Sequence, residues 1–289
     1  MNLAGYWHTA MVRKVVDAAD RRYLSQLVQT PISLKKLLAT VIVLPLLAYA
    51  VLCLIFVTNQ RHMLYFPTPD IAHTVATELR LDLGGESLKI WHHPRATGKA
   101  MLYFGGNAES VASSVAHLRT AFPGHALFVM NYRGYGGSSG EPSEPALVDD
   151  ARALFDYVQQ RYSDVGVVGR SLGSGVAMQL AADRPVTKLA LVTPFDSIAT
   201  IIEDRFWFLP VSILLRDKFD SAKHAKDIES PVLLILAEND EIVTRDSSMA
   251  LLRAFGEHNA AAVVLANEGH NSIAGSAGYL SALRDFFAE

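Results

Sequence analysis

The feature that most restricts the fold of this chain is an uninterrupted apolar run near its amino terminus. Residues Leu37–Val57 are 21 consecutive residues without a charge. About 20 helical residues cross the ~30 Å hydrocarbon core of a bilayer, where every backbone polar group needs an internal partner. The run therefore predicts a transmembrane helix over 37–57, kinked at Pro45. A buried core helix or a cleaved signal peptide fits less well, because the run has no polar face and begins far from Met1.

Charges flanking the run predict its orientation. Six basic residues precede it between positions 13 and 36, whereas only Arg61 and His62 follow closely. This bias predicts an inside amino terminus and a domain on the far, periplasmic or extracytoplasmic side. Residues 1–36 form a separate basic segment with helical spacing; a cytoplasmic cap, a membrane-surface helix and a solvated tail helix all remain open. Cys53 lies within the apolar run, which favours an inert packed or lipid-facing thiol.

Composition excludes some classes of partner. The net charge is −3, with no basic excess and no acidic tail. Nucleic-acid binding is therefore not expected. With 289 residues, half of them hydrophobic, the chain can bury a large core without a disulfide or a metal.

After a connecting segment over 58–86, short apolar runs alternate with helical stretches through 87–289. This alternation predicts an α/β fold with a mostly parallel central sheet and helices on both faces. A segment rich in aromatic and charged residues, about 196–230, interrupts it and predicts a small lid-like insertion above the carboxyl edge of the sheet. The predicted strands are 88–92, 100–104, 126–131, 165–169, 188–193, 232–237 and 262–266; the predicted helices are 108–121, 145–162, 173–183, 245–257 and 275–288.

The sequence Gly169-Arg170-Ser171-Leu172-Gly173 lies between a predicted strand and a predicted helix. In that context G-x-S-x-G is typical of a nucleophile elbow, a turn so tight that side chains two residues before or after the serine would clash. Ser171 is therefore the predicted nucleophile. A serine hydroxyl needs a base, and His270 follows the last predicted strand.

A third residue should orient the histidine and stabilise its charged form. Asp240 follows the strand 232–237, with Glu238 and Glu241 as alternatives. The order Ser171, Asp240, His270 is the order expected of a triad in this type of sheet. For the oxyanion hole we expect the backbone N–H groups of Leu172 and Asn107, with Gly106 permitting close approach.

Several motifs in order carry a family resemblance. Residues 100–272 resemble the α/β-hydrolase superfamily, and more narrowly the Bem46-like, or ABHD13-like, membrane-tethered branch. The resemblance implies the triad roles above and a preceding membrane anchor. The motifs are FGGNAES (104–110), NYRGYGGSSGEPSE (131–144), GRSLGSG (169–175), TPFDS (193–197), KFDS (218–221), ENDEIV (238–243) and GHN (269–271).

Two positions depart from that family pattern. Gly105 stands where members usually carry histidine, and Thr244 where they often carry proline. We expect neither change to abolish activity. In the NYRGYGGSSG loop, Arg133 or Tyr135 is expected to brace the site, in a structural rather than a catalytic role.

The predicted function is hydrolysis of a carboxylic ester or thioester through an acyl-enzyme, by a membrane-anchored serine hydrolase. An amidase, a peptidase or an acyltransferase uses the same triad, and a non-catalytic membrane scaffold could keep the fold. The anchor favours a small-molecule or lipid-like acyl substrate. No cofactor is expected. No metal is expected either, because His92, His93, His117 and His125 lack ligand spacing with carboxylates.

Overall fold

The computed structural model describes residues 33–72, 75–256 and 259–288 and divides them between two compact units, the first ending at Ile55 and the second beginning at Phe56. The predicted basic segment 1–36 lies almost wholly outside the described residues. The strands are β1 (Thr77–Leu83), β2 (Glu86–His93), β3 (Lys99–Phe104), β4 (Ala126–Met130), β5 (Asp164–Arg170), β6 (Leu189–Val192), β7 (Val232–Ala237) and β8 (Ala260–Leu265). The α-helices are α2 (Leu34–Leu64), α3 (Val115–Ala121), α4 (Glu144–Gln159), α5 (Leu172–Asp183), α6 (Ile198–Arg205), α7 (Val211–Leu214), α8 (Ser221–His224), α9 (Arg245–Phe255) and α10 (Ala277–Ala288), with short 3₁₀ turns at Val111–Ser114, Ala225–Asp227 and Ser272–Gly275.

The second unit is built on one eight-stranded sheet in the order β1-β2-β4-β3-β5-β6-β7-β8. β1 pairs antiparallel with β2, and β2 pairs antiparallel with β4. All later pairings, from β4–β3 to β7–β8, are parallel. Parallel strands have their carboxyl ends at one edge, so the loops that follow β3, β5, β7 and β8 gather there. The predicted mostly parallel sheet is confirmed.

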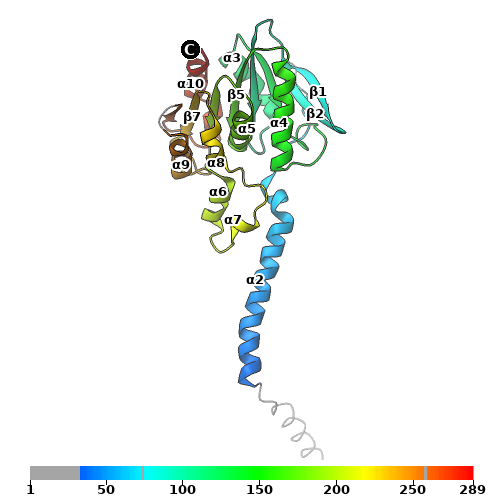
Figure 1. The fold of residues 1–289 in the computed structure, drawn as a ribbon, viewed down its shortest axis with the longest axis vertical. Coiled ribbons are helices and arrows are strands. Elements are labelled where there is room, and N and C mark those ends of the chain that lie inside the picture. The colour runs from blue at the N-terminus through cyan, green and yellow to red at the C-terminus, as the bar shows by residue number, and fades with distance from the viewer. Residues whose placement is uncertain (1–32, 73–74, 257–258, 289) are drawn as a thin grey trace, which may run out of the picture. The chain divides into compact units, whose positions relative to one another are not determined.

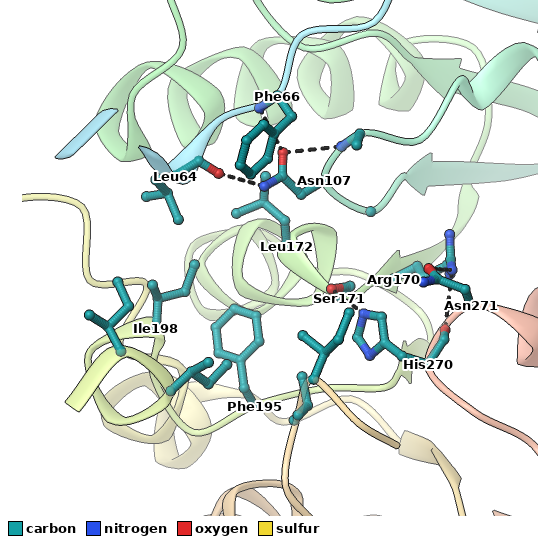
Figure 2. Close-up of a pocket in the computed structure, with 16 residues that line it drawn as sticks. Leu64, Phe66, Asn107, Arg170, Ser171, Leu172, Phe195, Ile198, His270 and Asn271 are labelled. Carbon is teal, nitrogen blue, oxygen red and sulfur yellow. Dashed lines mark hydrogen bonds between the residues drawn. The ribbon is translucent and has the colours of Figure 1, made fainter. Parts of the chain in front are cut away.

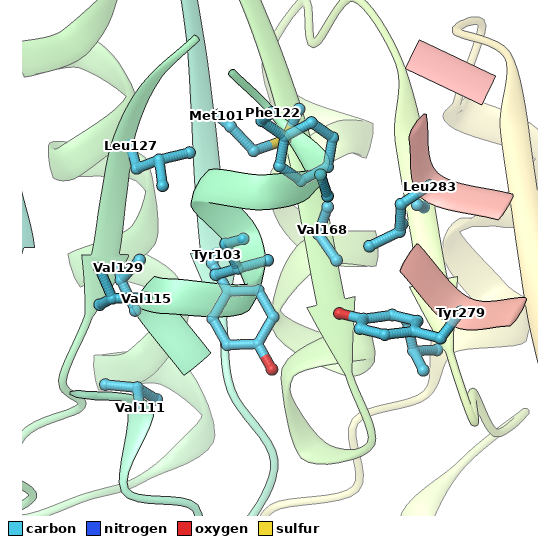
Figure 3. Packing of buried hydrophobic residues seen from close by; sticks show 14 of the residues in the cluster. Met101, Tyr103, Val111, Val115, Phe122, Leu127, Val129, Val168, Tyr279 and Leu283 are labelled. Atoms are coloured by element: carbon cyan, nitrogen blue, oxygen red, sulfur yellow. The ribbon is translucent and has the colours of Figure 1, made fainter. Parts of the chain in front are cut away.

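Helices cover both faces of the sheet (Figure 1). α3 and α10 pack together on one face, while α4, α5, α8 and α9 form a layer of successive contacts on the other. Between α3, α10 and the strands lies a buried cluster that includes Met101, Tyr103, Phe122, Val168 and Leu283 (Figure 3). β3 and β5 are buried on both sides, which explains why they are continuous apolar runs rather than alternating ones.

The first unit contains most of α2, and this helix includes the whole predicted span 37–57. Its most apolar 18-residue window has a mean hydropathy of 2.8. Within the described part of the chain, it is the one helix long and apolar enough to cross a membrane. Leucine, isoleucine and valine side chains are exposed around it, as expected if lipid surrounds them.

Two segments differ from the prediction. The segment 58–86, predicted as a connection, holds the end of α2 and the whole of β1. β1 alternates Leu79, Leu81 and Leu83 with charged residues and turns at Gly84-Gly85 into β2, which is a hairpin pattern. The helix predicted over 108–121 begins as a 3₁₀ turn at Val111 and becomes α-helical only at Val115, because the residues before it form a bonded loop at the carboxyl edge of the sheet.

The loop after β4 is fastened to α4 by a buried ion pair. Arg133 donates from Nε and Nη2 to the two Asp150 oxygens at 2.7 and 2.6 Å, and Asp150 is fully buried. Burial raises the pKa of Asp150, and the guanidinium opposes that rise. Arg133 therefore has the structural role that the sequence predicts.

We expect Arg133→Met to lower the free energy of unfolding by about 3 kcal/mol, because it leaves a buried carboxylate unpaired. Urea denaturation of the full chain in detergent measures the change. The matched control is Arg152→Met, whose partners Asp149 and Asp183 are exposed, and it should cost less than about 1 kcal/mol. Equal losses in the two variants would contradict the structural role of the Arg133–Asp150 pair.

Candidate active site

Ser171 lies at the turn between β5 and α5, at the carboxyl edge of the sheet. Its backbone has φ 49° and ψ −117°, a conformation that a non-glycine residue rarely adopts. The turn is held from both sides, since the Ser171 N–H donates to Val192 O at 2.8 Å and Ser171 O accepts from the Ser174 N–H at 2.8 Å. This geometry is the predicted elbow.

The glycines flanking Ser171 are required by close packing. A Cβ on Gly169 would lie 2.4 Å from the Gly173 carbonyl oxygen. A Cβ on Gly173 would lie 2.1 Å from the Phe104 carbonyl oxygen, at the end of β3. Both distances are far below van der Waals contact with rigid backbone atoms. The start of α5 can therefore rest against β3 only because neither position has a side chain.

The three residues predicted as a triad lie together. Ser171 Oγ is 2.9 Å from His270 Nε2, and His270 Nδ1 is 2.9 and 3.0 Å from the two Asp240 oxygens. Asp240 Oδ1 also accepts from the N–H groups of Ile242 and Val243 at 2.9 and 2.8 Å, which fixes the carboxylate. His270 and Asp240 are buried, with side-chain exposures of 5% and 7%.

The alternative acids have other partners. Glu238 accepts from the Asn267 N–H at 2.8 Å, and Glu241 accepts from the His270 backbone N–H at 3.2 Å. Both shape the loop that carries His270, but the ring of His270 bonds Asp240. Of the three carboxylates, Asp240 therefore has the geometry for orienting the imidazole.

A cavity of about 380 Å³ opens over Ser171 (Figure 2). That volume is within the range of small-molecule sites. Its lining is mainly apolar, and the polar groups that face it belong to the loops carrying Asn107, Ser171 and His270. The apolar lining includes Leu64, Phe66, Leu172, Phe195, Ile198 and Ile202. A molecule with an apolar chain next to its reacting carbon fits such a cavity.

The loop after β3 carries the predicted second oxyanion donor. Asn107 and Leu172 both line the cavity beside Ser171. A Cβ on Gly106 would be 3.6 Å from the Ser171 Cβ, so the loop passes directly against the serine. Among the described residues, neither the Asn107 N–H nor the Leu172 N–H has a protein acceptor. Both donors are therefore available to a ligand atom.

The Asn107 side chain fixes that loop to the end of α2 and to the segment after it. Its Oδ1 accepts from the Tyr135 hydroxyl at 2.9 Å and from the Phe66 N–H at 3.0 Å, and its Nδ2 donates to Leu64 O at 2.5 Å. Tyr135 thus braces the site as predicted. The involvement of Leu64 and Phe66 has no signal in the sequence.

Sequence reasoning also missed a buried ion pair. Arg170 Nη1 donates to Glu109 Oε2 at 2.9 Å, and Arg170 Nη2 donates to the His270 carbonyl at 3.2 Å. Glu109 Oε2 accepts from the Gly106 N–H at 2.7 Å as well. Arg170 and Glu109 therefore join three loops: the oxyanion loop, the elbow and the histidine loop.

Charges in this network are set by burial and proximity. Burial alone would lower the pKa of Arg170, but the adjacent Glu109 carboxylate raises it above its ordinary value. Burial, reinforced by Glu109, raises the pKa of the Tyr103 hydroxyl, which stays protonated and donates to Glu109 Oε1 at 2.8 Å.

The two departures from the family pattern have local explanations. A Cβ on Gly105 would lie 2.4 Å from the Val111 Cγ1 and 3.2 Å from the Glu109 carboxyl carbon, so those side chains occupy the space of the missing histidine. Tyr132 donates to Gly105 O at 2.7 Å and supports the loop. Thr244 caps α9, accepting from the Ser247 N–H at 3.3 Å.

Comparison with known proteins agrees with this architecture. A family profile described as the alpha/beta hydrolase fold matches residues 99–211. An uncharacterized protein of Mycobacterium tuberculosis is 34% identical over 276 residues, covering 87% of this chain and 95% of that protein. The chain belongs to the α/β-hydrolase family. The family resemblance predicted from the motifs is thereby confirmed.

Other α/β-hydrolase relatives are more distant. Protein bem46 of Schizosaccharomyces pombe is 29% identical, covering 65% of this chain and 67% of that protein. A lysophosphatidylserine lipase, ABHD12 of Xenopus tropicalis, is 30% identical, covering 59% and 50%. The esterase Pf2001 of Pyrococcus furiosus superposes with a TM-score of 0.63 at 16% identity, covering 77% of this chain and 98% of that one. That likeness concerns the α/β-hydrolase fold.

We expect Gly173→Ala to lower the free energy of unfolding by about 2–3 kcal/mol, because its Cβ collides with the backbone of β3. Gly124→Ala is the matched control, since nothing lies within 4 Å of a Cβ there. The two midpoints of urea denaturation give the comparison. If Gly173→Ala is as stable as the control, the close contact between α5 and β3 is wrong.

Proposed function

We propose that this α/β-hydrolase is a membrane-anchored serine hydrolase that cleaves a carboxylic ester or thioester through an acyl-enzyme. Ser171 is the nucleophile, His270 the general base and Asp240 the orienting acid. The observation that carries the proposal is the continuous chain of contacts from the Ser171 hydroxyl through the His270 ring to Asp240, each at about 3 Å. The basic residues before the apolar run support an extracytoplasmic catalytic unit.

The proposed reaction has two halves. Ser171 Oγ attacks the acyl carbon while its proton passes to His270 Nε2, and His270 then protonates the departing alcohol or thiol. Water, deprotonated by His270, attacks the acyl-enzyme and releases the acid. Asp240 accepts the Nδ1 hydrogen, which holds Nε2 in the basic form facing Ser171.

Negative charge develops on the acyl oxygen in both halves. The N–H groups of Asn107 and Leu172 are the proposed donors, and each such donor is worth roughly 3–4 kcal/mol in related chemistry. Leu172 is the first residue of α5, so the positive end of the helix dipole adds to the stabilisation. The Asn107 donor depends on the bonds that fix its side chain.

An amidase, a peptidase or an acyltransferase would use the same residues and differ in leaving group or acceptor. The apolar cavity lining and the apolar helix favour an acyl ester with a lipid-like chain. A chromogenic ester series of increasing acyl length, run beside matched thioesters and anilides, separates these substrate classes. Among the described residues, no group of three His, Cys, Asp or Glu side chains could hold a metal ion.

We expect a fluorophosphonate probe to label the wild type and to fail with Ser171→Ala. Ser212→Ala, at an exposed serine of α7, is the matched control and should label normally. Absence of labelling in a folded wild-type sample would favour the non-catalytic scaffold.

The three carboxylates can be ranked by amide substitution. Asp240→Asn should lower kcat/KM for a chromogenic ester by about 10³–10⁴-fold, because the imidazole loses its orienting partner. Glu238→Gln should have an effect of less than about tenfold, since Glu238 accepts a bond from the Asn267 backbone N–H and the His270 ring bonds Asp240 instead. A larger loss in Glu238→Gln than in Asp240→Asn would contradict the assigned acid.

Arg170 is proposed as a positioning residue. Arg170→Lys keeps a cation near Glu109 but cannot donate to Glu109 and the His270 carbonyl together, so kcat/KM should fall by about 10- to 100-fold through misplaced loops. Arg170→Met should lose more activity and also stability, because Glu109 becomes a buried, unpaired acid. If Arg170→Lys has a higher kcat than Arg170→Met and an unchanged melting temperature, Arg170 acts by positioning the loops. Equal melting temperatures and equal activities in the two variants would contradict that role.

A further inference from the structure

The insertion between β6 and β7 exposes large apolar side chains. Trp207 is 84% exposed and Ile213 80%, and Phe208, packed edge-on to Trp207 with ring centroids 6.0 Å apart, is 43% exposed. They lie in the turn between α6 and α7 and in α7 itself. Burying such side chains is favourable, and an exposed apolar group of this kind marks a surface for a partner or a lipid phase.

The same segment is bound to the last turns of α2 within the second unit. Gln60 Oε1 accepts from the Arg216 N–H at 2.7 Å, and Gln60 Nε2 donates to Leu214 O at 3.3 Å. Arg61 donates to Asp217 at 2.9 and 3.3 Å, and the Tyr65 hydroxyl donates to it at 3.2 Å. Asp217 is 2% exposed, while Arg61 remains 46% exposed. The bonds hold the end of α7 and the residues after it against residues 60–65.

Chain continuity gives the depth of this contact relative to a bilayer. The apolar run ends at Val57, three residues before Gln60. At 1.5 Å per helical residue, Gln60 follows the end of the run by about 5 Å. If the run spans a membrane, its end lies at the bilayer surface, and the bonded α7 segment lies at the depth of the headgroups.

The composition of the exposed segment suits that depth. Tryptophan concentrates at membrane–water interfaces, and tryptophan and phenylalanine are typical of the apolar face of segments that lie in the interface. Asp204, Arg205 and Ser212 are exposed beside Trp207 and Ile213, and their polarity keeps the segment out of the hydrocarbon core. The apolar group and its polar border thus match a shallow interfacial contact.

We propose that residues 206–213 form a second membrane contact, in which Trp207, Phe208 and Ile213 lie in the lipid headgroup region next to the carboxyl end of α2. The proposal rests on the membrane anchor of the proposed function and extends it to the substrate. Two walls of the cavity come from the elements that this contact would hold at the bilayer: Ile198 and Ile202 from α6, and Leu64 and Phe66 from the end of α2 and the segment after it (Figure 2). The substrate class that follows is an amphiphilic acyl ester taken directly from the leaflet.

The contact can be measured without relying on activity. Cys53→Ala removes the single cysteine of the full chain, after which Ile213→Cys or Thr120→Cys provides one labelling position for the fluorophore NBD. Thr120 is exposed in α3, a helix that runs toward the edge of the sheet opposite the cavity, and is the matched control. In phosphatidylcholine vesicles, the label at 213 should emit at shorter wavelength and be quenched by dibrominated phosphatidylcholine about threefold more than the label at 120.

Equal quenching at both positions would overturn the proposal. A blue shift at 213 that grows with the protein-to-lipid ratio, without quenching by brominated lipid, would assign the surface to a second copy of the chain and would overturn it too. Neither the emission wavelength nor the quenching depends on hydrolysis, so both measurements test the membrane contact even if the proposed esterase activity is absent.

The consequence for the substrate has its own test. Trp207 and Ile213 do not line the cavity. The double variant Trp207→Ser with Ile213→Ser should therefore hydrolyse a short, water-soluble chromogenic ester at the wild-type kcat/KM. Its turnover of a long-chain ester carried in the same vesicles should fall by about tenfold. An equal fall in activity on both substrates, or unchanged activity on both, would contradict uptake from the leaflet.

Discussion

The site depends on one strained turn. Ser171 has a positive φ because β5 must end and α5 begin within a single residue, and the turn can persist only where Gly169 and Gly173 let the helix touch the backbone of β3. That contact does three things at once: it raises the serine oxygen above the sheet, directs the first N–H of α5 at the cavity, and brings the loop after β3 against the serine. The position of every other group in the site is set relative to this turn.

Two further sets of hydrogen bonds hold the neighbouring loops in place relative to this turn. Arg170 belongs to the turn itself and binds Glu109 in the oxyanion loop and the carbonyl of His270, so displacement of any one loop strains the other two. Asn107 extends the network to Leu64, the last residue of α2, and to Phe66, which follows the helix. The loop of Asn107, the turn at Ser171 and the last residue of α2 are therefore parts of one hydrogen-bonded structure.

Much of this could be predicted from the sequence, because the relevant signals are local. Buried strands such as β3, β5 and β7 are short apolar runs, and the glycines around Ser171 are adjacent to it, so the parallel sheet and the elbow follow from patterns within a few residues. β1 is an edge strand that pairs with β2 alone, so it lacks the continuous apolar run that marks the buried strands, although its alternating leucines before Gly84-Gly85 form a hairpin pattern. The Arg170–Glu109 pair joins residues 61 positions apart, and the bonds of Asn107 to Leu64 reach 43 positions back. Such pairings are produced by the fold and carry no periodic signal that a single sequence reveals.

The central claim is that Ser171 becomes acylated during turnover. Rapid mixing of the full chain in detergent with an activated ester, acid quenching within the first turnovers, and peptide mass spectrometry would test it most directly. The account predicts an acyl group on the peptide that contains Ser171, formed before steady state and lost with time as water releases the acid. Hydrolysis without any adduct, or an adduct on a different side chain, would contradict it.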